Sequence, residues 1–289
     1  MTELYRDSAK VKGAHDGMDR AAIDLAYNCA AAFSDVAKWR EIWQERSMRA
    51  SLPKGSILEV PYGARPLQKI DVFPIGLAQA ATVLFFHGGF WSRHDKGTFR
   101  FLLDPIHRAG FNAAFAGYTL APVRDFGEIV ADAAQATQWL ASNLSALGLA
   151  QKALVLLGWS AGAHLVAMQM DRPGIAAGIA ISGIYDLAPM RIGSVNDLLH
   201  LDQNAVERYS PSRLKVTCSA PLTVAYGMND LPAFQEQSIN FYEAWARRSL
   251  PVSLLALPGH HHHSVFEDLY PPSGQLHLEL MKLHQLTDA

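Results

Sequence analysis

A serine in a G-x-S-x-G motif is the first residue of this sequence whose surroundings suggest chemistry. Residues 156–165 read L-L-G-W-S-A-G-A-H-L, so Ser160 is flanked by Gly158 and Gly162. An apolar run leads straight into Gly158, and a helical pattern begins just after Ser160. This order is typical of a nucleophile elbow, a turn too sharp for side chains at the two glycine positions. An ordinary glycine-flanked turn is the alternative, but the flanking pattern favours Ser160 as a catalytic nucleophile.

The H-G-G-F-W stretch that starts at His87 directly follows another apolar run, A-T-V-L-F-F. Acyl transfer needs hydrogen-bond donors that are aimed at the developing oxyanion. We expect the backbone N–H groups of Gly88, Gly89 and Ala161 to be these donors. A similar H-G-G-G motif occupies this place in esterases, and Phe90 stands where its third glycine would be. We expect His87 to hold the loop by a hydrogen bond rather than to react; a tight turn without function is the alternative.

A serine hydroxyl needs a histidine that accepts its proton and a carboxylate that orients this histidine. After an elbow of this kind, the acid and then the histidine follow along the chain, each after a strand. Asp230 follows the apolar run P-L-T-V-A-Y-G and is the predicted acid. Asp186, in S-G-I-Y-D-L, follows the preceding strand and ranks second; its other role would be to cap or orient a loop near the pocket.

Four consecutive histidines, at positions 260–263, follow the last apolar run, P-V-S-L-L-A-L-P, where the general base is expected. Neighbouring side chains diverge, by about 100° each in a helical turn, so at most one or two can face Ser160. The residues alone leave the register open. A His-rich tract can also bind metal, but adjacent histidines rarely bind a single ion and no separate metal-ligand spacing accompanies the run. We therefore predict no metal and no cofactor.

Apolar runs alternate with helical patterns through most of the chain. Residues 20–50 predict one or two amphipathic helices, and the segments I-L-E-V-P-Y-G and Q-K-I-D-V-F-P predict an antiparallel hairpin. Further strands are predicted at 81–86, 111–118, 153–158, 174–182, 221–227 and 251–258, with helices at 127–147, 233–249 and 272–286 among those between them. This alternation predicts an α/β fold with a mainly parallel sheet covered on both faces. We expect one domain, 1–289, with an N-terminal helical segment (about 1–55) and a catalytic core (56–289).

The charge balance and the cysteines exclude several kinds of function. The net charge is −2 with acidic and basic residues mixed, so we expect no nucleic-acid or membrane partner. Cys29 and Cys218 are far apart and predict neither a disulfide framework nor a thiolate metal site. The polar first 20 residues do not resemble a signal peptide, and no apolar run approaches the length of a membrane span. These features predict a cytoplasmic enzyme with a small-molecule substrate; a homodimer stays open.

Several motifs together resemble the arylformamidase (kynurenine formamidase) branch of the α/β-hydrolases. They are H-G-G-F-W, G-W-S-A-G-A-H-L, S-G-I-Y-D-L and D-L-P-A-F-Q-E-Q-S, with the early Y-N and the later Y-G-A-R-P-L-Q-K-I-D-V-F. The resemblance covers nearly the whole chain and implies the α/β-hydrolase fold. The family's acid lies in a D-x-P-x-F context, which implies Asp230. Its histidine precedes an aromatic residue and Ser-Val, which implies His262 as the base. Because His263 stands where the family has the aromatic residue, His261 and His263 stay open as alternatives.

The expected pocket is aromatic, because aromatic residues flank the motifs or follow strands at the same end of the sheet. Such side chains suit an apolar or aromatic ligand, although ordinary core packing is the alternative for each. The predicted pocket residues are Phe90, Trp91, Tyr118, Trp159 and Tyr185. We expect the N-terminal helices to form a lid over them.

The residues and the resemblance together predict a serine hydrolase that cleaves a small amide or ester through an acyl-enzyme. Ser160 would attack the carbonyl carbon, His262 would transfer the proton to the leaving group, and Asp230 would orient His262. The resemblance favours an aryl formamide as the substrate. A carboxylesterase for small aromatic or short-acyl esters is the nearest alternative. A metal-dependent formamidase and a non-catalytic, ligand-binding relative are the others.

Overall fold

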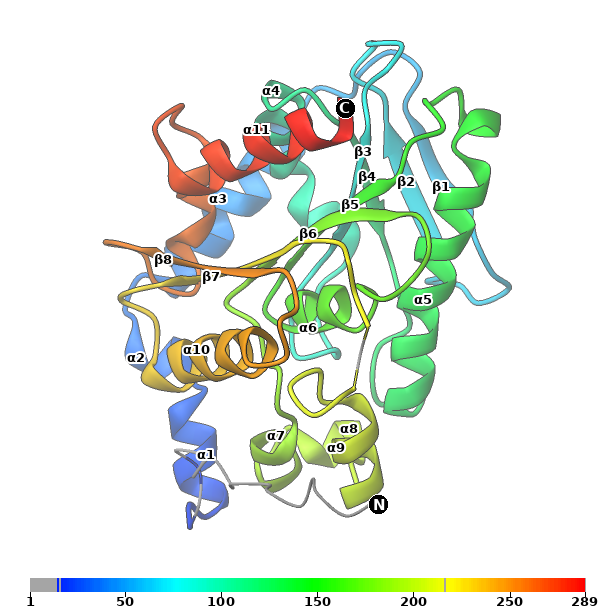
Figure 1. Cartoon of the computed structure of the whole chain (residues 1–289). Helices are drawn as coiled ribbons and strands as arrows, with labels where there is room; N and C mark the ends of the chain where they lie inside the picture. Colours follow the sequence, from blue (N-terminus) through cyan, green and yellow to red (C-terminus); the bar gives the residue numbers. More distant parts are fainter. Residues whose placement is uncertain (1–14, 16, 216, 289) are drawn as a thin grey trace.

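A central sheet organises the molecule (Figure 1). The computed structural model describes residue 15 and residues 17–215 and 217–288, so residues 1–14, most of the stretch predicted not to be a signal peptide, lie outside it. Within these residues the sheet has eight strands in the order β1-β2-β4-β3-β5-β6-β7-β8. β2 pairs antiparallel with both β1 and β4, and all other pairs are parallel. The strands are β1 (Ile57–Pro61), β2 (Lys69–Phe73), β3 (Thr82–Phe86), β4 (Asn112–Ala116), β5 (Leu154–Trp159), β6 (Ile175–Ile181), β7 (Leu222–Gly227) and β8 (Val252–Leu257).

Helices cover both faces of the sheet. In Figure 1, α3, α4 and α11 lie at the upper left, α6 and α10 lie below the sheet, and α5 runs along its right side. The α-helices are α1 (Arg20–Ala26), α2 (Cys29–Ala32), α3 (Val36–Arg49), α4 (Leu103–Arg108), α5 (Phe126–Asn143), α6 (Ala161–Ala167), α7 (Ala188–Ile192), α8 (Asn196–Leu199), α9 (Gln203–Tyr209), α10 (Pro232–Ala246) and α11 (Gln275–Asp288). Short 3-10 helices are η1 (Lys96–Leu102), η2 (Ser145–Leu147) and η3 (Ser264–Leu269).

The alternation of side chains along the strands creates two hydrophobic cores. In β3, Val83 and Phe85 pack in the core that contains residues of α3, α4 and α11. Leu84 and Phe86 point to the opposite core, which contains residues of α5, α6 and α10. A strand that is buried on both faces has no polar position to reserve for solvent, which explains its uninterrupted apolar run.

The predicted fold class and most predicted elements are confirmed. The hairpin forms as β1 and β2, and each later apolar run forms a strand. The segment 20–50 forms three helices rather than one or two, because Asn28 and Asp35 each begin a new helix. Residues 188–209 contain the three short helices α7, α8 and α9, which lack a long apolar stripe and were not predicted. No helix in the described part of the chain is long and apolar enough to cross a membrane.

The N-terminal helices pack across one end of the sheet, beside elements from distant parts of the sequence. α1 contacts α7, and the Asp24 carboxylate accepts a hydrogen bond of 2.6 Å from the Ser194 backbone N–H. α3 contacts η1, and Arg46 forms an ion pair with Glu267 of η3. These helices therefore stand next to the loops that follow the parallel strands.

Candidate active site

Ser160 lies in the tight turn between β5 and α6. Its backbone has φ 56° and ψ −119°, an unfavourable conformation for a residue with a side chain. Ser160 is only 2% exposed. A Cβ atom at Gly158 would overlap the backbone of Gly162, and one at Gly162 would overlap the carbonyl oxygen of Phe86. The two glycines of the motif are therefore required by close backbone contact. This is the geometry expected of a nucleophile elbow.

His262 and Asp230 form a buried hydrogen-bonded pair. The His262 Nδ1 atom lies 3.0 Å from the Asp230 Oδ2 atom, and both residues are less than 5% exposed. A carboxylate only accepts hydrogen bonds, so Nδ1 carries the proton and Nε2 has a free lone pair, as a general base needs. The Leu231 backbone N–H donates to Asp230 Oδ1 at 2.8 Å, and the Trp159 indole N–H donates to the His262 carbonyl at 2.9 Å. The ring of Phe234 packs on the imidazole at 4.0 Å.

The other three histidines of the run have different partners. His261 Nε2 lies 3.2 Å from the Asp35 carboxylate, and its ring stacks on Phe33. His260 Nε2 lies 3.7 Å from an Asp268 carboxylate oxygen. His263 stacks on Trp43 at 5.5 Å, and burial, with the charges of His262 and Arg40 adding to it, lowers its pKa to about 2. Of the four, only His262 is hydrogen-bonded to Asp230.

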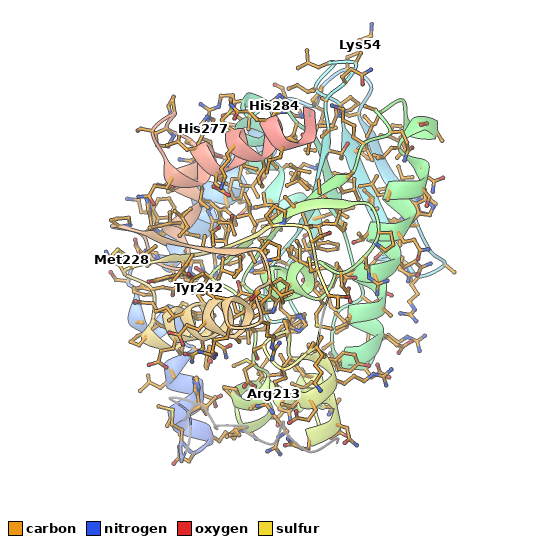
Figure 2. The ribbon with its side chains drawn as sticks, in the orientation of Figure 1. Lys54, Arg213, Met228, Tyr242, His277 and His284 are labelled. Atoms are coloured by element: carbon orange, nitrogen blue, oxygen red, sulfur yellow. The ribbon has the colours of Figure 1, made fainter. Side chains whose placement is uncertain are left out.

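Asp186, the second-ranked acid, is part of another network. Arg213 holds its carboxylate at 2.9 Å, and its Oδ1 atom accepts a hydrogen bond from the Ala188 N–H. Figure 2 shows Arg213 beside α8 and α9, at the end of the molecule opposite α11. The carboxylate therefore binds the N–H of the first residue of α7 and orients the loop before this helix, the other role considered for Asp186.

The H-G-G loop presents free backbone donors beside the elbow. Gly89 has a φ of 113°, and a Cβ atom there would overlap the Arg93 carbonyl oxygen, whereas one at Gly88 would overlap the Trp159 ring. Within the described residues, the N–H groups of Gly88 and Gly89 have no acceptor. Ala161, the third predicted donor, is the first residue of α6. Two of the predicted donors are thus on the loop beside the elbow and the third is at the N-terminus of α6, next to Ser160.

The buried side chain of His87 packs against the H-G-G loop and forms a hydrogen bond to it. Its Nδ1 atom donates to the Gly88 carbonyl at 2.8 Å, and its ring stacks on Tyr118 at 4.4 Å. The Tyr118 hydroxyl donates to the His87 carbonyl at 2.7 Å. Burial lowers the pKa of His87 to about 4, so the ring is neutral at pH 7. It orients the loop and has no place in proton transfer.

One cavity of about 440 Å³ contains both Ser160 and His262 in its wall. Of the predicted aromatic pocket residues, Phe90 and Trp159 line it. The outer wall comes from the N-terminal helices, through residues that were not predicted to line the pocket: Ile23, Asp24, Tyr27, Asn28, Cys29, Ala30 and Arg40. The position expected for the lid is therefore occupied by these helices.

Three of the predicted pocket residues lie elsewhere. Trp91 is fully buried, with its ring against Phe126 and His164. Tyr185 is fully buried and stacks on Phe241 at 4.1 Å, and Tyr118 lies under the H-G-G loop against His87. Each follows a strand at the correct end of the sheet, but its side chain points into the protein interior. These three positions are corrected to core residues that support the site.

The charges at the cavity are mainly positive. Arg40 and Arg93 line it, and neither guanidinium has an ion-pair or hydrogen-bond partner in the part of the chain that the structure describes. Burial and then the charges of these two arginines lower the pKa of His94, which lines the same cavity. Asp24 is the acidic residue of the lining. The cavity therefore suits a ligand that carries an anionic group.

Cys29 is an unexpected neighbour of the His262–Asp230 pair. Its Sγ atom, a carboxylate oxygen of Asp230 and a ring nitrogen of His262 all lie within 4.8 Å of one another, and all three residues are buried. Burial and the nearby Asp230 charge raise the pKa of the thiol. The sequence carried no signal for this proximity, because Cys29 is in the N-terminal helices and is not part of a recognisable metal motif.

Comparison with known proteins agrees with this geometry. The α/β hydrolase fold family matches residues 83–210. A kynurenine formamidase of Danio rerio is 32% identical over 81% of this chain and 84% of its own length, and one of Salmo salar is 30% identical over 84% and 86%. A solved structure from Silicibacter sp. TM1040, provisionally described as a thioesterase, is 28% identical with a TM-score of 0.80, covering 92% of this chain and 99% of the other. These findings confirm the resemblance seen in the motifs. The chain belongs to the kynurenine formamidase family of the α/β hydrolase fold and is a hydrolase of amide or ester bonds.

Proposed function

We propose that the protein is an arylformamidase that uses Ser160, His262 and Asp230 as a catalytic triad. The observation that carries this proposal is the hydrogen-bonded His262–Asp230 pair in the wall of the cavity that also contains Ser160. A serine in a strained elbow, an imidazole that faces the cavity and a carboxylate that holds its Nδ1–H together supply the groups that acyl transfer needs.

In the proposed reaction, the Ser160 hydroxyl attacks the formyl carbon while its proton moves to His262 Nε2. The N–H groups of Gly88, Gly89 and Ala161 would bind the oxyanion of the tetrahedral intermediate. The carbon–nitrogen bond then breaks, the arylamine leaves with the proton from the imidazolium, and a formyl ester of the serine remains. Water, deprotonated by the same imidazole, attacks this ester and releases formate.

The lining of the cavity supports an aromatic substrate with a charged head. Tyr27, Phe90 and Trp159 offer aromatic contacts. Arg40 and Arg93 have no protein partner among the described residues, so they are free to bind a carboxylate. The relatives are named kynurenine formamidases, and the formyl derivative of kynurenine carries an aryl formamide, a carboxylate and an ammonium group. Asp24, which lines the cavity, would pair with the ammonium group. A cytoplasmic location and a homodimer stay predictions that fractionation and light scattering can test.

A carboxylesterase is the second candidate, favoured by the similarity of the fold to solved esterases. Esterase B of Lactobacillus rhamnosis superposes with a TM-score of 0.72 at 19% identity over 94% of this chain and 97% of the other. Both reactions use the same triad, but an amide demands protonation of its leaving group, whereas an activated ester does not.

The test compares the rates with an aryl formamide and a p-nitrophenyl ester for the wild type and Ser160→Ala. We expect the wild type to have the higher kcat/KM for the aryl formamide and Ser160→Ala to lose at least about a thousandfold of both activities. A preference for the ester would favour the carboxylesterase. Binding of the formamide without turnover would favour the non-catalytic alternative, and full activity of Ser160→Ala would overturn the proposal.

A further inference from the structure

Cys29 has no part in the proposed reaction, yet its thiol lies beside the two groups that move the proton. It is the first residue of α2, whose N-terminus is capped by the Asn28 side chain. Its Sγ atom lies within 4.8 Å of both an Asp230 oxygen and a His262 nitrogen. The Asp230 oxygen and the His262 nitrogen also lie within 4.8 Å of each other. The side chains come from three separate elements: α2, the loop after β7 and the loop after β8.

The three side chains form a donor set that suits a thiophilic divalent cation. Zinc binds a thiolate sulfur, an imidazole nitrogen and a carboxylate oxygen at about 2.0–2.3 Å, which places neighbouring ligand atoms roughly 3.2–3.8 Å apart. Ligand atoms within 4.8 Å of one another therefore need to approach by at most about 1.0–1.6 Å.

The position of the cluster leaves a route for an ion and for a fourth ligand. Cys29 and His262 both line the 440 Å³ cavity, while Asp230 lies behind them and is only 4% exposed. An ion would enter from the cavity and could keep a water molecule on that side. Three protein ligands and one open position are a common arrangement for zinc.

We propose that Cys29, Asp230 and His262 form an inhibitory site for a thiophilic divalent cation such as Zn²⁺ or Cd²⁺. Binding replaces the proton of the Cys29 thiol, which is released to solvent as the metal–sulfur bond forms. The metal also binds an Asp230 oxygen and His262 Nδ1, the ring nitrogen that faces Asp230. The proton of Nδ1 moves to Nε2 as the metal–nitrogen bond forms, so Nε2 can no longer accept the proton of Ser160. Metal binding at these three residues does not depend on which reaction the protein catalyses. Only the inhibition rests on the proposed function.

The other histidines of the run do not belong to this site. His260 and His261 lie against Asp268 and Asp35, and the ring of His263 stacks on Trp43. Among the described residues, the group of possible ligands therefore draws one histidine from the run, together with a cysteine and an aspartate from elsewhere.

The test is a titration of the full-length protein with Cd²⁺, followed by the ultraviolet charge-transfer absorption of cadmium–thiolate bonds. The wild type, Cys29→Ser and the matched control Cys218→Ser are compared, with circular dichroism as the check on folding. We expect a saturable signal of one ion per chain in the wild type and in Cys218→Ser, and loss of the signal in Cys29→Ser. Cys29→Ala serves as the second variant if the serine variant does not fold.

Inhibition is measured in parallel as the Zn²⁺ concentration that halves each variant's own uninhibited rate. We expect this concentration to rise at least tenfold in Cys29→Ser, to stay unchanged in Cys218→Ser, and activity to return with EDTA. No thiolate signal in the wild type, a signal that is lost with Cys218, or equal inhibition of Cys29→Ser and the wild type would overturn the proposal. A Cys29-dependent signal in a protein that hydrolyses neither amide nor ester would support the metal site and refute the proposed function.

Discussion

The cavity has two walls that are built in different ways. The inner wall carries Ser160 and His262 on loops that follow the parallel strands β5 and β8, and both residues are at most 3% exposed. The outer wall consists of short N-terminal helices, and Arg40 on it is exposed. Some of the contacts that join these helices to the rest of the molecule are partly exposed ion pairs, such as Arg46–Glu267. The comparison suggests that the inner wall performs the chemistry and the outer wall selects the ligand.

The inner wall should give the largest effect, and its neighbouring histidines offer an internal control. We expect His262→Ala to lower kcat at least about a thousandfold, because His262 is the cavity-lining ring that the Asp230 carboxylate orients. His261→Ala should retain activity to within about tenfold, because its ring contacts Asp35 and Phe33 instead. Steady-state kinetics on an aryl formamide measures kcat for both variants and the wild type. A dead His261→Ala with an active His262→Ala would mean that the base is assigned one position too late.

A smaller effect is expected from the two arginines that line the cavity, Arg40 on the outer wall and Arg93 on the loop after β3, and it should fall on KM. Removing Arg40 or Arg93 should raise KM about tenfold for an aryl formamide that bears a carboxylate, and leave KM for a neutral ester within about twofold. Arg191 is the matched control, because its side chain also lacks a partner among the described residues and does not line the cavity. Equal changes in KM for both substrates would contradict a role in binding the carboxylate.

His263 lies between the two walls and should affect stability more than rate. Burial lowers its pKa to about 2 from 6.5, so below pH 6.5 the unfolded chain binds a proton that the folded protein does not. The folded state therefore loses stability as the pH falls. His263→Phe keeps a ring against Trp43 and removes this group, which should flatten the fall between pH 6.5 and 4 by up to about 1.4 kcal/mol per pH unit. Urea unfolding at several pH values measures it; parallel curves for variant and wild type would contradict the explanation.

The smallest effect is expected where the outer wall is attached. Arg46 donates two hydrogen bonds to the Glu267 carboxylate, at 2.6 and 3.1 Å, and thereby links α3 to η3. Both side chains are partly exposed, so solvent weakens their attraction. We expect Arg46→Met to lower the free energy of unfolding by about 1 kcal/mol or less, as measured by chemical denaturation. A much larger loss would show that the outer wall depends on this pair more than its exposure suggests.

The two walls also differ in how far the sequence could predict them. Buried parallel strands leave long apolar runs, and the turn after β5 leaves a glycine pattern, so the positions of Ser160 and Asp230 follow from chain order. The choice of His262 among the four histidines needed the family resemblance, because adjacent histidines cannot be distinguished by sequence until their contacts are known. The structure brings His262 to Asp230 by folding the loop after β8 across the end of β7.

The direction of side chains and the contacts between distant helices were beyond the sequence. Trp91 and Tyr185 follow the correct strands, but only the three-dimensional structure shows that their rings turn into the core. Arg40 and Cys29 reach the cavity because α2 and α3 fold over loops that come much later in the chain. No local pattern reports such proximity, so most of the outer wall could not be predicted.

The central claim is that Ser160 is the nucleophile of an acyl-transfer reaction. An organophosphonate that carries a good leaving group reacts covalently with an activated serine, and peptide mass spectrometry locates the adduct. The account predicts loss of activity in step with one adduct per chain, on the peptide that contains Ser160, and no adduct in Ser160→Ala or His262→Ala. An adduct on another residue, or full activity after complete labelling of Ser160, would contradict it.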